Sequence, residues 1–282
     1  MTTDTIKSCL INNPVTYRSK LTLPEKENFG IEIELESVKF DEVKRLVKNQ
    51  FGPSWQVKTD DSLNMGENAE IVSPVLNNTK QTWLLIKKMG KLLNHLNPSY
   101  NNCSFQINYD GSLLPSVEDK VRFLKLYAMY EDIIYRFSKG EDETYRDSIE
   151  MYASPIILAL KCMFYFKSEY LLETFLNNKR YGIIFKNENK DLIEFRTPNM
   201  TSNPTLWQNY ITFFYYLLEF ASSNKYDKKE VDEYIDKFSK TYLLDSYSIE
   251  RKEKAIKLTK KIFPHSIDQI YFMHQYLGNK NK

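Results

Sequence analysis

Hydrophobic and charged residues alternate in the first regular segment of the chain. Residues 29–36 read Phe-Gly-Ile-Glu-Ile-Glu-Leu-Glu, and successive side chains of a β-strand point to opposite faces of its sheet. A strand over 29–37 therefore carries Glu32, Glu34 and Glu36 on one face and aliphatic side chains on the other. Glutamate is depleted in strands, and like charges on one face repel each other unless water or a cation compensates them. The pattern indicates either an edge strand with one solvated face or a strand that carries a cation site.

Periodicity along the rest of the chain predicts a mixture of strands and amphipathic helices. The further strands are expected at 54–59, 68–72, 103–109, 181–187 and 191–197. The helices are expected at 40–50, 79–95, 116–138, 155–177 and 204–222, with others near 227–239, 246–261 and 266–277. The short polar stretch Glu188-Asn189-Lys190 predicts a hairpin between the last two strands. This order favours an α+β fold, in which helices pack on one face of a largely antiparallel sheet.

Three regions follow from these patterns. We expect an N-terminal extension over residues 1–27, a main domain over 28–222 and a charged, helical C-terminal region over 223–282. The C-terminal helices would offer a docking surface for a protein partner, or simply a solvated face. The run of aromatic residues at 213–216 is apolar nearly all round and predicts a core helix.

Composition narrows the class of protein. The 282 residues are 42% hydrophobic, which is enough for a large core, and Lys+Arg 39 against Asp+Glu 37 gives a net charge of only +2. That balance does not suggest a nucleic-acid partner. No apolar run is long enough to span a membrane, and residues 1–14 lack the pattern of a secretory leader, so we expect a cytoplasmic protein.

The motifs of common metal and nucleotide sites are missing. The 3 cysteines and 3 histidines are scattered without zinc-ligand spacing, and the 8 glycines form neither a P-loop nor a dinucleotide-binding loop. A nucleotide or a metal ion would therefore have to be held by other residue types.

Polar residues on other predicted strands follow the same alternation as the first one. Glu70 lies in the strand at 68–72, Gln106 and Asn108 share a face, and so do Glu194 and Arg196. Carboxylate and amide oxygens are preferred ligands of Mg²⁺ or Mn²⁺, and an arginine beside them would stabilise a phosphoryl group in transfer. The alternatives are a solvated sheet face with one Glu194–Arg196 ion pair, and a metal site used for hydrolysis without ATP.

Five motifs in order resemble the amidoligase family, whose fold is similar to those of glutamine synthetase and glutamate–cysteine ligase. The motifs are Gly30-Ile31-Glu32-Ile33-Glu34, Trp55 with Asp60-Asp61-Ser62-Leu63, Glu70-Ile71-Val72-Ser73-Pro74, the stretch 103–108, and Ile193-Glu194-Phe195-Arg196 with Asn199-Met200-Thr201. The resemblance covers residues 28–222. It implies a ligase that uses ATP to phosphorylate a substrate carboxylate, from an amino acid or peptide, and then joins the acyl group to an amine.

The resemblance also implies roles for individual residues. Glu32, Glu34, Glu70 and Glu194 would hold the divalent cations. Arg196 would stabilise the transferred phosphoryl group, and Asp61 would lie near the substrate. Arg146, before Tyr152-Ala153-Ser154-Pro155, would contact an anionic group, and would otherwise lie in a surface loop. Apart from the resemblance, Arg180 at the start of the hairpin would contact a phosphate or the substrate carboxylate, because arginine binds oxyanions through two donors; otherwise it belongs to a solvated strand start.

One segment departs from the family pattern. Where the family has Cys-Gly-x-His-x-His, this chain has Cys103-Ser104-Phe105-Gln106-Ile107-Asn108, so amides stand at both histidine positions. Gln106 and Asn108 can offer carbonyl oxygens to a cation or nucleotide, but they cannot act as general bases near neutral pH. An inactive module that binds a nucleotide or a protein is therefore the alternative to a ligase.

Overall fold

Seven strands form one antiparallel sheet in the computed structural model, which describes residues 15–63, 67–142, 144–163, 166–186, 191–223, 225–238, 244, 247 and 250–278. The strands are β1 (Asn28–Glu36), β2 (Gln56–Lys58), β3 (Asn68–Val72), β4 (Leu76–Asn77), β5 (Phe105–Asp110), β6 (Ile183–Lys186) and β7 (Leu192–Phe195). Their order is β2-β3-β1-β5-β7-β6, and β4 pairs with the start of β1. The antiparallel sheet and the pairing of the last two strands are confirmed; the expected turn at 188–190 lies outside the described residues.

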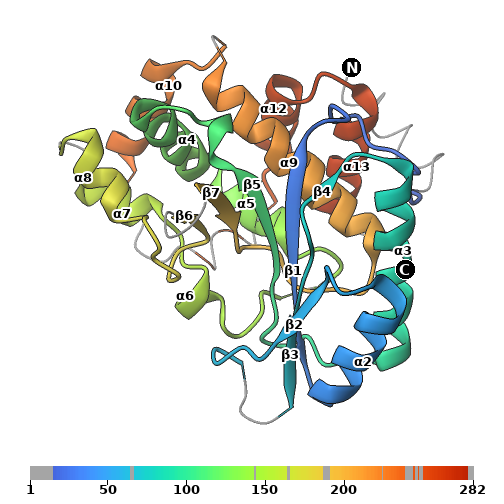
Figure 1. The fold of residues 1–282 in the computed structure, drawn as a ribbon. Coiled ribbons are helices and arrows are strands. Elements are labelled where there is room, and N and C mark those ends of the chain that lie inside the picture. Colours follow the sequence, from blue (N-terminus) through green and yellow to red (C-terminus); the bar gives the residue numbers. More distant parts are fainter. Residues whose placement is uncertain are drawn as a thin grey trace.

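Helices flank this sheet (Figure 1). Within the described residues they are α2 (Phe40–Phe51), α3 (Lys80–Leu96), the short 3₁₀ helix η1 (Gly111–Leu113), α4 (Val117–Met129), α5 (Glu131–Ser138), α6 (Ile149–Tyr152), α7 (Ile157–Cys162), α8 (Ser168–Glu173), α9 (Pro204–Ser222), α10 (Lys228–Lys237), α12 (Lys252–Ile262) and α13 (Ser266–Leu277). None of these helices combines the length and the apolar character needed to cross a membrane. The protein is thus a mixed fold of helices and one antiparallel sheet.

The aliphatic side chains of the central strand β1 form the middle of the core. Ile31, Ile33 and Leu35 are fully buried, and Ile33 lies opposite Ile71 of β3 and Phe105 of β5. A shift of one residue in this register would turn the glutamates of β1 into the core. The alternation seen in the sequence therefore excludes any register of β1 that is shifted by one residue.

Aromatic contacts join this apolar face to three helices. The rings of Phe29 and Trp83 of α3 stack at 5.6 Å, and those of Phe195 and Phe214 of α9 stack at 4.1 Å. Phe123 of α4 meets Phe195 edge to face at 5.8 Å. Helix α9 is buried nearly all round, which confirms that it is a core helix, and α3 and α9 lie on the same side of β1 in Figure 1.

The prediction of one continuous helix over 116–138 is wrong. It divides into α4 and α5 because Tyr130 leaves the helical conformation, with φ −111° and ψ 14°. The next residue, Glu131, then lies in the interior, where its carboxylate accepts hydrogen bonds from the backbone N–H groups of Ile156 and Ile157. A tertiary contact thus outweighs the local preference for a continuous helix.

The helix expected over 155–177 is also shorter than predicted. The region contains α7 and α8, separated at Lys167 by extended backbone with φ −61° and ψ 148°. The backbone then returns to the sheet, because Phe175 and Asn177 exchange hydrogen bonds with Phe185 of β6. This segment therefore pairs with the outer side of β6, where Leu176 and Phe185 form a parallel bridge.

Both ends of the described chain pack on the main sheet and helix layers. Phe272 of α13 stacks on Phe137 of α5 at 4.3 Å and contacts Phe213 of α9 at 4.9 Å. Arg18, near the N-terminus, forms an ion pair of 2.7 Å with Asp268 at the start of α13. The three C-terminal helices lie close to their predicted positions, although α12 begins only at Lys252.

Candidate functional site

The polar residues of four strands meet on the second face of the sheet. Register places Glu34 of β1 opposite Glu70 of β3, and Glu32 opposite Gln106 of β5. Asn108, two residues further along β5, lies opposite Glu194 of β7. All six side chains are buried, and Glu194 is 0% exposed. The structure therefore brings together most of the residues that the sequence assigned to a site, but on a covered face rather than a solvated one.

Each carboxylate on this face has specific partners. Glu34 accepts hydrogen bonds from the backbone N–H of Ser104, at 2.6 Å, and from the side-chain amide of Gln106. Glu32 accepts a hydrogen bond of 2.8 Å from Asn108 Nδ2. The two amides that stand at the histidine positions of the family pattern are therefore tied to the two inner glutamates of β1.

Glu194 lies between two cations. Its Oε1 accepts a hydrogen bond of 2.9 Å from Arg196 Nη1, and its Oε2 forms an ion pair with Lys186 of β6. Arg196 Nη1 also donates to Gln106 Oε1 at 3.0 Å, and Lys186 Nζ reaches Glu32 Oε1 at 3.4 Å. Lys186 thus joins the carboxylates of β1 and β7.

The pKa values of Glu32 and Glu70 are shifted in opposite directions. Burial raises the pKa of Glu70 well above its usual range, and the neighbouring charge of Glu32 adds to this effect. Burial also acts to raise the pKa of Glu32, but hydrogen bonding to Glu70 and the charges of Lys186 and Lys58 outweigh it, so the pKa of Glu32 is lowered. Lys58 Nζ of β2 lies 2.9 Å from Glu70 Oε2. Glu32 therefore holds a negative charge more readily than Glu70 does.

Arg146 binds the backbone next to the site. It is 4% exposed, and its guanidinium donates hydrogen bonds to the carbonyl oxygens of Arg196, at 2.7 Å, and Thr197, at 3.1 Å. Burial lowers the pKa of Arg146 to about 10, and the charge of Glu34 opposes this shift. Its donors thus bind the backbone that follows β7, which fixes the position of Arg196.

Two predicted residues lie apart from this cluster. Asp61 is exposed in the turn after β2, next to Asp60, whose carboxylate accepts hydrogen bonds from Ser62. Arg180 is exposed in the turn before β6, where its backbone carbonyl accepts a hydrogen bond from Ser154 N–H. The structure does not bring either side chain together with the buried carboxylates.

Lys58 and Lys186 belong to the site but were not predicted from the sequence. Each is the last residue of an edge strand, β2 or β6, and its side chain lies on the polar face by the same alternation that marks the glutamates. The available signal was a basic residue at a position of a predicted strand whose side chain points to the same face as the glutamates. Their long side chains reach carboxylates on other strands, and the strand order that allows this is not readable from local pattern.

The oxygen donors suit a magnesium ion in kind, although no three carboxylate, histidine or cysteine side chains of the described residues already form a metal-ligand set. Glu32, Glu70 and Glu194 face ammonium groups of Lys58 and Lys186. These groups compensate the carboxylates electrostatically, as a bound cation would. A divalent ion at Glu32 and Glu70 would therefore displace the ammonium group of Lys58.

A cavity of about 400 Å³ adjoins the carboxylates at one end of the polar face. It is lined by residues at the start of β1, the end of β3, the end of β5 and the start of β7, including Gly30, Glu32, Val72, Asn108 and Leu192. Its size is in the range of about 300–1,000 Å³ that small-molecule sites occupy. Glu32 and Asn108 belong both to the cavity and to the carboxylate cluster.

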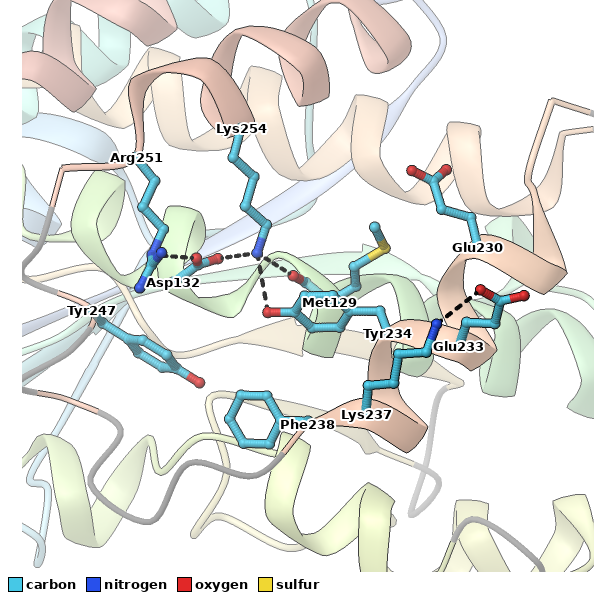
Figure 2. Close-up of a pocket in the computed structure, with 10 residues that line it drawn as sticks. All are labelled: Met129, Asp132, Glu230, Glu233, Tyr234, Lys237, Phe238, Tyr247, Arg251 and Lys254. Carbon is cyan, nitrogen blue, oxygen red and sulfur yellow. Dashed lines mark hydrogen bonds and ion pairs between the residues drawn. The ribbon is translucent and has the colours of Figure 1, made fainter.

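A second cavity, of about 580 Å³, lies between α4, α5, α10 and α12 (Figure 2). Its charged groups form ion pairs, most of them within the lining, while Glu230 pairs with Lys257 and Lys261 outside it. Asp132 lies 3.0 Å from Arg251 Nε and 2.7 Å from Lys254 Nζ, and Lys254 also donates to Tyr234 Oη and the Met129 carbonyl. These contacts hold the C-terminal helices against the junction of α4 and α5.

A buried glutamate lies beside this second cavity. Glu131 is 0% exposed, and its carboxylate accepts hydrogen bonds from two backbone N–H groups and from Tyr247 Oη at 3.1 Å. Burial raises the pKa of Glu131 to about 8, although these hydrogen bonds act to lower it. Glu131 therefore retains its proton at neutral pH in the folded protein.

Comparison with known proteins adds no relative. No protein-family model matches the chain, and a search of curated proteins finds no match. The resemblance to amidoligases thus depends on the order and identity of the motifs themselves.

Proposed function

We propose that the protein is an ATP- and Mg²⁺-dependent carboxylate–amine ligase. The observation that carries the proposal is the buried set of Glu32, Glu70 and Glu194, gathered from three strands beside Arg196 and next to a cavity of small-molecule size. Together with the order of the amidoligase-like motifs, this set supports phosphoryl transfer by charge compensation and positioning.

In the proposed reaction, an oxygen of the substrate carboxylate attacks the γ-phosphorus of ATP, and ADP leaves. The amine nitrogen then attacks the acyl carbon, inorganic phosphate leaves, and the amine loses a proton. Bound Mg²⁺ would supply positive charge to the phosphate oxygens. Glu32, Glu70 and Glu194 would hold it, with Asn108 as a further oxygen donor.

The residues of this chain would orient the reacting groups. Arg196 is held at its Nη1 by Glu194 and Gln106, and at its Nε by the carbonyl oxygen of Tyr152 at 3.1 Å. A guanidinium fixed by three acceptors is suited to stabilise the charge that spreads over a transferred phosphoryl group, because it needs little reorganisation. Lys186 would change partners when a cation binds Glu32 and Glu194.

A specific observation favours a second candidate, an inactive nucleotide- or protein-binding module. Gln106 uses its Nε2 on Glu34 and its Oε1 on Arg196, so the amide is engaged on both sides. It offers no base to take the proton of the incoming amine. In this second candidate the face would bind its ligand without turnover.

Both the ligase and an inactive nucleotide-binding module require a nucleotide to bind at the carboxylates. Calorimetric titration of a non-hydrolysable ATP analogue, with Mg²⁺ and again with EDTA, tests this binding. We expect magnesium-dependent binding that weakens at least tenfold in Glu194→Gln, because that variant removes the carboxylate between Lys186 and Arg196. The matched control is Glu25→Gln, at an exposed glutamate that pairs only with the exposed Lys20 among the described residues. Equal binding by wild type and Glu194→Gln, with both folded by circular dichroism, would refute the assignment of the site.

Measurement of ADP release separates the two candidates. A ligase releases ADP only when carboxylate and amine are both present, so a panel of amino acids and short peptides with and without amines is the appropriate screen. Binding of the analogue without amine-stimulated ADP release in any combination would favour the inactive module.

A further inference from the structure

The second cavity, between α4, α5, α10 and α12, is larger than the cavity beside Glu32 and shares no lining residue with it. Its volume of about 580 Å³ lies within the range of about 300–1,000 Å³ that small-molecule sites occupy. None of its lining residues takes part in the proposed phosphoryl transfer. A ligand of this cavity would therefore bind independently of the proposed ATP site.

Aromatic rings form part of the wall of the second cavity. Figure 2 shows Tyr234, Phe238 and Tyr247 among the lining residues. The rings of Tyr234 and Phe238 lie 6.4 Å apart. The ring of Tyr247 packs 5.5 Å from that of Tyr135, and its hydroxyl donates to Glu131 Oε2 at 3.1 Å, so its position is fixed. Walls of this kind suit a ligand with an aromatic ring.

Each carboxylate in the lining of this cavity faces two cationic groups. The pairs are Asp132 with Arg251 and Lys254, Glu230 with Lys257 and Lys261, and Glu233 with Lys229 and Lys237. Glu131, beside the cavity, adds no negative charge at neutral pH, because burial raises its pKa to about 8. Positive charge is therefore in excess around the cavity, which favours an anionic ligand.

Arg251 is the cation of the lining that still has donors to offer. Lys254 already uses its ammonium group on Asp132 Oδ1, on the Met129 carbonyl and on Tyr234 Oη. Arg251 Nε lies 3.0 Å from Asp132 Oδ2, but its two Nη groups have no partner among the described residues. A guanidinium binds a carboxylate through two parallel N–H donors. Arg251 can therefore hold one carboxylate of a ligand.

We propose that the second cavity binds a small aromatic carboxylate, with its ring against Tyr234, Phe238 and Tyr247 and its carboxylate on the Nη groups of Arg251. A protonated amine would meet the excess of positive charge and is disfavoured. The ligand would join α10 to the start of α12, because Tyr234 lies in α10 and Arg251 directly precedes α12. Its binding would therefore stabilise the packing of these two helices.

Four small probes separate the contributions of ring and charge. Binding of 3-phenylpropionate, 3-phenylpropanol, 3-phenylpropylammonium and butyrate to the wild-type protein is measured by calorimetry and by ligand-observed NMR at neutral pH. We expect 3-phenylpropionate to bind about tenfold or more tightly than each of the others, because it alone combines a ring with a group that accepts charge-assisted hydrogen bonds. Equal binding of the three ring-bearing probes, or no binding of 3-phenylpropionate, would overturn the proposal.

Two substitutions test the two contacts separately. Arg251→Gln should weaken 3-phenylpropionate about tenfold and leave 3-phenylpropanol unchanged, whereas Phe238→Ala should weaken both probes. The matched control is Arg45→Gln, at an exposed arginine of α2. Circular dichroism and the unfolding transition establish that each variant folds. Binding of 3-phenylpropionate by folded Arg251→Gln at the affinity of the wild type and of Arg45→Gln would overturn the proposal.

Gly30→Val distinguishes the second cavity from the cavity beside Glu32. It fills the latter, where a Cβ atom on Gly30 would make only ordinary contacts of 3.6 and 3.9 Å, and it should leave 3-phenylpropionate binding unchanged. Loss of binding in Gly30→Val but not in Arg251→Gln would place the probe beside Glu32 and overturn the proposal. Saturating 3-phenylpropionate should also slow amide hydrogen exchange in α10 and α12. Slower exchange in β1 alone would contradict the assignment.

Discussion

Replacement of Glu131 by glutamine should change how the stability of the protein depends on pH. Glu131 is completely buried, and its pKa is raised to about 8 by burial, against an ordinary value of 4.5. Between these two values the folded protein retains a proton that the unfolded chain has lost. The contribution of this group to stability is therefore fully present below pH 4.5, decreases as the pH rises, and levels off above about pH 8.

The magnitude follows from the two pKa values. Each pH unit between them corresponds to about 1.4 kcal/mol of differential proton binding. A pH of 7 lies 2.5 units above the ordinary pKa of 4.5. Through this group alone, the free energy of unfolding at pH 7 should therefore be about 3 kcal/mol lower than at pH 4.5. Glutamine has nearly the same shape and cannot titrate, but its single carbonyl oxygen can accept from only one of the two backbone N–H groups that Oε1 and Oε2 of Glu131 bind. The substitution therefore adds a loss of stability that is the same at every pH, and the test is the change of the difference with pH.

Urea unfolding followed by tryptophan fluorescence measures the effect. The free energy of unfolding is determined at pH 5, 6, 7 and 8 for wild type, Glu131→Gln and the exposed control Glu25→Gln. The difference between wild type and Glu131→Gln should change by about 3 kcal/mol over this range in favour of the glutamine variant, while the control runs parallel to wild type. A difference that is the same at every pH would refute the reasoning.

Three further changes have defined outcomes. Gly90→Ala should lower the free energy of unfolding by about 1–3 kcal/mol, because the added Cβ would lie 2.9 Å from Pro204 Cδ, a cost larger than the roughly 1 kcal/mol of improved helix propensity; greater stability in urea would contradict this. Arg146→Lys should cost about 1–3 kcal/mol, since lysine cannot reproduce the fork that binds the carbonyls after β7, and an unchanged melting temperature would contradict it. Asp132→Asn should accelerate amide hydrogen exchange in α12 but not in β1, because the charge that faces Lys254 and Arg251 is lost. Equal protection of α12 in the wild type and in Asp132→Asn would show that Asp132 does not hold this helix in place.

Local pattern made much of the polar face predictable. In β1 and β7 the alternation of apolar and charged residues gave both the position of the strand and the face of each glutamate, because the period of a strand depends only on its own residues. The pairing of Glu34 with Glu70 and of Asn108 with Glu194 then depends on strand order. That order is decided by contacts between distant segments.

Other features depended on tertiary structure from the start. The local sequence does not indicate that the helix is interrupted at Tyr130, because the interruption depends on the buried contacts of Glu131 with a distant segment. The lysines of the edge strands, Lys58 and Lys186, compensate carboxylates on strands far from them in sequence. Asp61 was assigned by resemblance to a motif and Arg180 by its place at the start of the predicted hairpin, and both are exposed in turns.

The position of Lys58 has a consequence for association between molecules. An open sheet ends in edge strands, whose unpaired backbone groups can add a strand from another chain. Lys58 lies on β2, an edge strand of only three residues, whereas the outer side of β6 is already paired with residues 175–177. Short edges that carry a charge pointing over the sheet are poor templates for such addition. Loss of charge at Lys58 would therefore favour aggregation, so resistance to aggregation and charge compensation of Glu70 depend on the same side chain.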